Sequence, residues 1–150
     1  MKGILKVHKK LPLLMAVPTT AGTGSETTLA AVITDADTRY KYAINDFPLI
    51  PRYAVLDPKV TLSLPPFITA TTGMDALTHA IEGYTTKAAW EMTDMFHLKA
   101  IELISNSLRG AVANTKEGRE GMALGQYIAC LLYTSPSPRD GATSRMPSSA

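Results

Sequence analysis

The chain has 150 residues, 45% of them hydrophobic and 19% charged, with a formal net charge of +2. These values indicate a soluble globular protein the size of one average domain, or of parts of two. They exclude a strongly basic nucleic-acid-binding surface, because Lys and Arg cluster only at residues 2–10. No apolar run approaches the roughly 18 residues of a membrane span, so no membrane contact is expected.

Cys130 is the single cysteine, which excludes an internal disulfide and a multi-cysteine zinc site. The basic N-terminus precedes an apolar stretch that is short for a signal peptide and lies between Pro12 and Pro18. We therefore expect a cytoplasmic protein.

The first half of the chain predicts strands and loops. Residues 13–17, LLMAV, are a short apolar run ended by Pro18, as in a buried parallel strand. Residues 27–34 are rich in β-branched residues and predict a strand, or a helix start followed by a strand. Residues 39–44 can pair back with them as a hairpin, and residues 52–58 predict another short strand.

The pattern changes to helices near Pro65. Residues 67–86 have a helical pattern with a break at Gly73, residues 90–109 form the best amphipathic helix, and residues 118–129 begin another. The apolar positions of the second helix recur every three or four residues: Met95, Leu98, Ile101, Ile104 and Leu108. The predicted fold class is α/β followed by all-α, with a change of domain between residues 64 and 65.

Residues 130–150 do not share this pattern. They are dominated by Ser, Pro, Arg and Ala without periodicity, and such a composition cannot bury enough apolar surface to offset the entropy lost on ordering. They also resemble translated sequencing-adaptor ends. We predict a disordered, foreign tail that begins at residue 130 or 131; the alternative is a disordered native tail.

Residues 18–26 read PTTAGTGSE and follow the first predicted strand. Gly22 and Gly24 match the first half of a GxGxxG dinucleotide fingerprint, but Thr27 stands at the third glycine position. Two interpretations are open. The small side chains either admit a cofactor close to the backbone, or they form a tight connection between a strand and a helix.

Residues 73–84, GMDALTHAIEGY, place Asp75 and His79 four apart and therefore on one helix face. A carboxylate and an imidazole at this spacing suit Fe(II), Zn(II), Mn(II) or Co(II), although a solvated pair has the same spacing. A catalytic site usually has at least three protein ligands, and the others are not evident. Glu82 either supports a ligand or faces water, and His97 is expected at the surface or the core edge.

Together these stretches resemble the iron-containing (group III) alcohol dehydrogenase family. The resemblance is carried by PTTAGTGSE and TTGMDALTHAIEGY, and it extends from about Leu11 to Ala129 through KYAINDFPLIPRYAVLDP and the LPP at 64–66. The stretch EGYTTKAAWEMTDMFHLKAIELI is similar to the lactaldehyde reductase and propanediol oxidoreductase members.

The resemblance implies two domain parts and a reaction. Residues 1–64 would be the C-terminal part of an α/β dinucleotide-binding domain, and residues 65–129 the N-terminal part of a helical metal domain. The parent protein, implied to be a homo-oligomer, would transfer a hydride between a small alcohol or diol and NAD or NADP. The metal would act as a Lewis acid on the substrate oxygen, and the nicotinamide would take the hydride.

The same resemblance implies the site residues. Two threonines would contact the cofactor, two hydroxyl residues would lie close by, and a lysine would reach its ribose or phosphate region: Thr19 and Thr20, Thr23 and Ser25, and Lys41. Asp75 and His79 would hold Fe(II), or zinc in some members. No catalytic residue is expected beyond these metal ligands.

The chain departs from the family at both ends. The family's glycine-rich pyrophosphate loop lies upstream of these residues, and two further histidine ligands lie downstream of GQYIA. We therefore expect the 150-residue chain alone to lack appreciable activity. The alternatives are a relative similar to glycerol dehydrogenase or dehydroquinate synthase, and a non-catalytic remnant that only associates with other chains.

Overall fold

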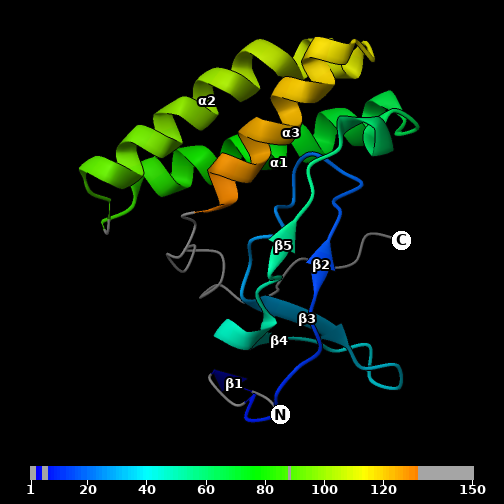
Figure 1. Ribbon diagram of the computed structural model, residues 1–150, viewed down its shortest axis with the longest axis vertical. Coiled ribbons are helices and arrows are strands. Elements are labelled where there is room, and N and C mark those ends of the chain that lie inside the picture. The colour runs from blue at the N-terminus through cyan, green and yellow to red at the C-terminus, as the bar shows by residue number, and fades with distance from the viewer. Residues whose placement is uncertain (1–2, 5–6, 88, 132–150) are drawn as a thin grey trace.

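The computed structural model describes residues 3–4, 7–87 and 89–131. Short strands come first in these residues and long α-helices follow, so the predicted fold class is confirmed. The helices pack together at one end of the molecule and the strands lie below them (Figure 1). Residues 132–150, most of the predicted tail, lie outside the described residues.

The strands of the described part form two small sheets. Their bounds are β1 (Gly3–Ile4), β2 (Met15–Ala16), β3 (Ala30–Thr34), β4 (Lys41–Asn45) and β5 (Tyr53–Ala54). β3 and β4 pair antiparallel, which confirms the predicted hairpin, and β1 adds to β4 in parallel. β2 and β5 form a separate parallel pair. Two 3₁₀ turns, Phe47–Leu49 and Pro58–Thr61, flank β5.

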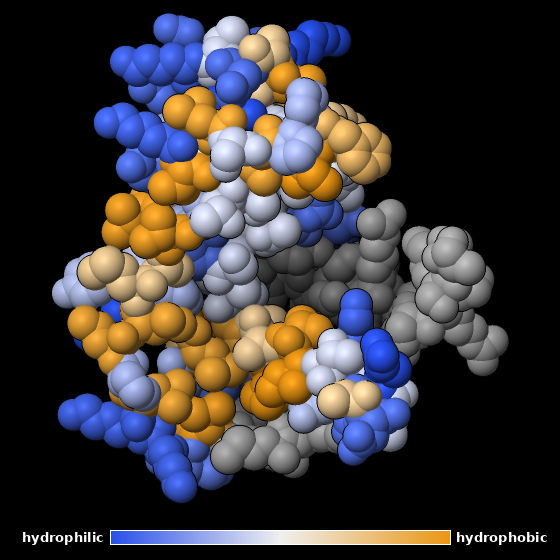
Figure 2. All heavy atoms as spheres, turned by 90° about the vertical axis from the view of Figure 1, so that its right-hand side faces the viewer, coloured by the Kyte–Doolittle hydropathy of each residue, from blue (hydrophilic) through white to orange (hydrophobic). Residues whose placement is uncertain are grey.

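The strand predicted at residues 13–17 pairs in parallel as expected, but it is short and its side chains are not buried. Its large apolar residues expose 46% to 69% of their surface: Leu13, Leu14, Met15 and Val17. Parallel sheets are normally covered on both faces, and the described residues leave this one open. Figure 2 shows hydrophobic side chains spread widely over one side of the molecule.

The helices agree with the predicted segments to within a few residues at each end. Their bounds are α1 (Pro66–Thr85), α2 (Glu91–Val112) and α3 (Lys116–Leu131). A proline at the first position of α1 loses no hydrogen bond there. Between α2 and α3, Asn114 adopts a left-handed φ of 62°, a conformation common just after a helix C-terminus. None of the described helices has the length and apolar character needed to cross a membrane.

The predicted break at Gly73 is wrong, because α1 continues through it. A Cβ at Gly73 would lie 2.3 Å from Leu108 Cδ1, so the glycine permits close packing of α1 against α2. The buried core of the helices also consists mainly of small side chains, with two larger ones: Ala76, Ala80, Ala100, Ala111 and Ala129, with Ile104 and Met122. Small contact residues bring helix axes close together.

The buried face of α2 differs from the apolar positions that the sequence predicts for this helix. Ile104 is buried, whereas Met95 and Leu98 are exposed. His97, predicted at the surface or the core edge, is only 1% exposed, so that expectation is wrong. Its ring lies on α1 at Gly83, where a Cβ would come within 2.3 Å of His97 Nε2. The missing side chain of Gly83 provides the space that the imidazole fills.

The helix α3 includes the first two residues of the predicted tail. Cys130 and Leu131 belong to the helix, and Cys130 packs against the buried core. Residues 130 and 131 are therefore helical, while the foreign origin of residues 130–150 stays a prediction.

Candidate functional site

Residues 18–27, which we call the glycine loop, connect β2 to β3 and lie on the helices. Gly22 approaches α1 so closely that a Cβ would lie 2.0 Å from the Thr72 carbonyl oxygen. Gly24 has a left-handed φ of 58° and covers Cys130, whose Sγ would be 2.2 Å from a Cβ. The loop joins two strands, so the second of the two interpretations, a connection between a strand and a helix, is wrong. The glycines permit close approach, here to α1 and α3.

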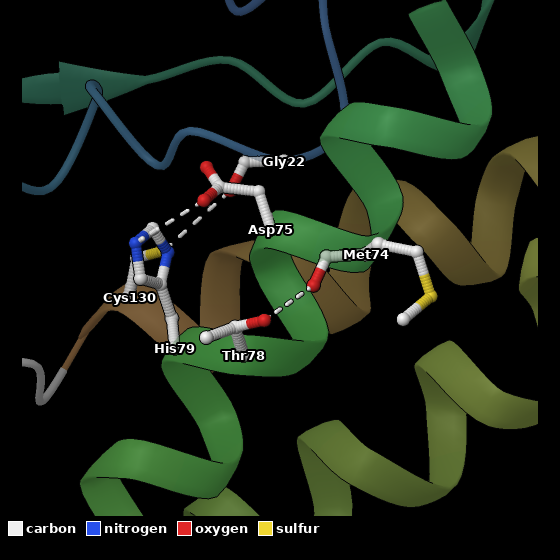
Figure 3. A network of polar contacts seen from close by, with 6 residues as sticks. All are labelled: Gly22, Met74, Asp75, Thr78, His79 and Cys130. Atoms are coloured by element: carbon white, nitrogen blue, oxygen red, sulfur yellow. Dashed lines mark hydrogen bonds and ion pairs between the residues drawn. The ribbon is translucent and has the colours of Figure 1, made fainter. Parts of the chain in front are cut away.

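Asp75 and His79 lie on successive turns of α1 and share one face of it, next to the glycine loop (Figure 3). Asp75 Oδ1 is 3.9 Å from His79 Nε2, and the two side chains are 48% and 22% exposed. Cys130 Sγ lies 3.5 Å from the other ring nitrogen, His79 Nδ1. This arrangement leaves Nε2 as the ring nitrogen that faces Asp75.

The pair fits one half of a metal site. A carboxylate oxygen and an imidazole nitrogen suit Fe(II) or Zn(II), and a separation of 3.9 Å allows one ion to lie about 2.0–2.2 Å from each atom. Within residues 3–4, 7–87 and 89–131, no group of three or more His, Cys, Asp or Glu could hold a metal ion. A site with three protein ligands would therefore need a ligand from outside the described part.

Cys130 lies beside His79 on the inner face of α3. Burial, followed by the charges of Glu26 and Asp75, raises the pKa of its thiol to about 12. The protonated thiol is therefore the favoured form near neutral pH. Cys130 acts as a packing residue beneath Gly24 and beside His79.

The other predicted site residues divide into two groups. The hydroxyl residues all belong to the glycine loop, three exposed and one half-buried: Thr19, Thr23 and Ser25, and Thr20. Lys41 is exposed at the start of β4, opposite Thr34. The structure thus brings the loop residues to the helix that carries Asp75 and His79, whereas no contact described within residues 7–87 joins Lys41 to them.

Sequence reasoning missed the polar contact that links the loop to α3. Gln126 Nε2 donates a hydrogen bond to Glu26 Oε1 at 2.5 Å, across 100 positions of sequence. One signal was available, because Glu26 is the only charged residue between positions 11 and 26. Nothing in the sequence pairs it with Gln126.

The chain matches two models of one family. The model for iron-containing alcohol dehydrogenase matches residues 1–58, and the C-terminal model of the same family matches residues 69–137. Together with an α/β part and a helical part, these matches define a class of iron-containing dehydrogenases. The chain belongs to the iron-containing alcohol dehydrogenase family. The second match reaches residue 137, within the segment predicted to be foreign.

Three relatives illustrate the similarity. The chain is 48% identical to lactaldehyde reductase of Escherichia coli over 129 residues. These residues cover 86% of this chain and 34% of that protein. It is similar to the crystal structure of a 1,3-propanediol oxidoreductase, with 40% sequence identity and a TM-score of 0.83. The match covers 88% of this chain and 35% of the oxidoreductase chain. Sulfoacetaldehyde reductase from Bifidobacterium kashiwanohense, in complex with NAD+, gives 39% identity, a TM-score of 0.78, and coverage of 89% and 37%. The chain spans about a third of the length of these relatives.

Proposed function

We propose that this chain is part of a metal-dependent oxidoreductase that transfers a hydride between a small alcohol or diol and NAD or NADP. One observation supports the proposal above all: Asp75 and His79 share a face of α1 beside the glycine loop, in a member of this family. The relatives named lactaldehyde reductase and 1,3-propanediol oxidoreductase support the substrate class, and the structure holding NAD+ supports the cofactor.

In this proposal Asp75 and His79 hold Fe(II), or zinc. The cofactor lies along the α/β part, at the residues that the family resemblance implies: Thr19, Thr20, Thr23, Ser25 and Lys41. When bound, the metal supplies Lewis acidity and the nicotinamide accepts the hydride. The Asp75 carboxylate supplies negative charge to a bound cation, and the contact of Cys130 with His79 Nδ1 orients Nε2 toward it.

The division into a dinucleotide-binding part, residues 1–64, and a metal-binding part, residues 65–129, belongs to the same proposal. The change from strands to helices at Pro66 supports it. We also propose a cytoplasmic, homo-oligomeric parent protein. The presence of only two candidate metal ligands in the described part supports the expectation that the 150-residue chain alone lacks appreciable activity.

A chimeric enzyme tests the proposal. Residues 1–129 replace the matching span of Escherichia coli lactaldehyde reductase, and the purified chimera is assayed for bound iron and for NAD-linked alcohol oxidation. We expect both properties, and we expect Asp75→Ala or His79→Ala to abolish both. Glu91→Gln, an exposed change on α2, is the control. Full iron content and activity after either ligand substitution would contradict the proposal.

A second measurement tests the proposal even if the chimera does not fold. The source locus is sequenced upstream of Met1 and past the codon for Ala129. A reading frame that continues into a helical stretch with two spaced histidines supports a complete metal site in the parent. A stop codon directly after residues 130–150 would leave the site incomplete and remove the enzyme proposal.

The exposed apolar residues 13–17 favour a second candidate function, association with another polypeptide. This candidate predicts that the chain purifies as an oligomer without iron. Iron retained at one ion per chain, and lost in His79→Ala, would argue against it.

A further inference from the structure

The glycine loop is held on α3 by one polar contact between buried side chains. Glu26 is 3% exposed and Gln126 is 1% exposed, and the Gln126 amide donates its hydrogen bond to Glu26 Oε1. The contact forms only when the loop lies on the helix, because the two residues are 100 positions apart. Gly22 and Gly24 also approach the helices closely, and Ala21 of the loop lies in the buried core.

This contact is incomplete. Glu26 Oε2 and Gln126 Oε1 are buried and have no hydrogen-bond partner in the part of the chain that the structure describes. A buried polar atom without a partner costs free energy that hydration would restore, and the cost is larger for a charged carboxylate. Seating the loop therefore leaves two acceptor oxygens unsatisfied.

We propose that the glycine loop is a lid that opens locally, moving away from α1 and α3 while the helices stay folded. Opening breaks the Glu26–Gln126 hydrogen bond but hydrates both unpartnered oxygens. Opening exposes little apolar surface, because Ala21 is the one hydrophobic residue of the loop in the buried core of the described residues. Segments with few buried apolar contacts open at lower free energy than the core. The inference rests on this contact and is independent of the proposed function.

The protein contains its own probe for the lid. Cys130 is the single cysteine of the chain, and it lies beneath Gly24 with its Sγ 4.0 Å from the Gly22 carbonyl oxygen. In the closed form Gly24 covers this side chain, which is only partly exposed. The rate of alkylation by iodoacetamide under native conditions therefore reports lid opening.

Glu26→Gln is the deciding variant. It removes the buried charge and adds an amide N–H that can donate to Gln126 Oε1, so both unsatisfied atoms are relieved. We expect amide hydrogen exchange of residues 20–27 to become about tenfold slower, which corresponds to about 1.4 kcal/mol. Glu117→Gln, an exposed change on the same helix as Gln126, is the matched control and should leave the rate unchanged.

Amide hydrogen exchange separates opening of the lid from fraying at the end of α3. We expect the amides of residues 20–27 to exchange faster than the core amide of Ile104, and Glu26→Gln to slow exchange in the loop alone. Gly22→Ala should act in the opposite direction and accelerate alkylation, because its Cβ would meet the Thr72 carbonyl. The inference is overturned if Glu26→Gln leaves hydrogen exchange in the loop unchanged or accelerates it, or if the loop exchanges only as fast as Ile104.

Discussion

Protonation of His97 is predicted to destabilise the helical layer in mild acid. The imidazole is almost fully buried against Gly83, and neither ring nitrogen has a hydrogen-bond partner of good geometry among the described residues. Burial lowers the pKa of His97, and the opposing influences of the Asp94 carboxylate and the Thr93 backbone are smaller. A proton added to the ring would place a charge in a buried helix interface.

The linkage between proton binding and folding gives the direction and the upper limit of this loss of stability. The unfolded chain titrates at the ordinary histidine value of 6.5, and the folded chain below it. The unfolded state therefore binds the proton more readily, so stability is complete above about pH 6.5 and falls as the pH decreases toward the folded pKa. The slope is at most about 1.4 kcal/mol per pH unit, and the loss levels off below the folded pKa.

Urea unfolding followed by helical circular dichroism measures this loss between about pH 5 and pH 8. We expect His97→Leu to remove the His97 part of the slope, because the variant has no titrating group at this position. His8→Gln, at an exposed histidine, is the control and should retain the slope of the unmodified chain. Equal slopes for His97→Leu and the unmodified chain would refute the reasoning.

Three further predictions concern packing, backbone conformation and the exposed surface. Gly83→Ala should lower the free energy of unfolding by about 1–3 kcal/mol, because its Cβ would lie 2.3 Å from His97 Nε2. Gly110→Ala, whose Cβ would have its nearest contact at 2.9 Å, should lower it less in the same urea titration, and the reverse order would contradict this prediction. Asn114→Ala should cost about 1–2 kcal/mol, because alanine tolerates the left-handed φ of 62° poorly, and an unchanged melting curve would count against it. Met15→Lys places a charge on exposed β2 and should reduce self-association in light scattering while changing stability by less than about 0.5 kcal/mol; unchanged scattering at equal stability would show that another surface associates.

Local patterns in the sequence determined much of this protein. The three helices and the hairpin of β3 and β4 follow from periodicity and turn residues, which act over a few neighbouring positions. Asp75 and His79 share a helix face because their spacing of four matches one turn, and this holds wherever the helix is placed. The two glycines of the loop predicted close approach to the backbone, although not what would approach.

Contacts between elements were decided only by the tertiary structure. The burial of His97 depends on the absent side chain of Gly83 on another helix, and the continuity of α1 through Gly73 depends on how α2 packs against it. The Glu26–Gln126 contact joins positions 100 apart, so neither residue carries a local signal for the other. Spacing within one element is set by backbone geometry, whereas these contacts arise only when the packed helices and the glycine loop lie against one another.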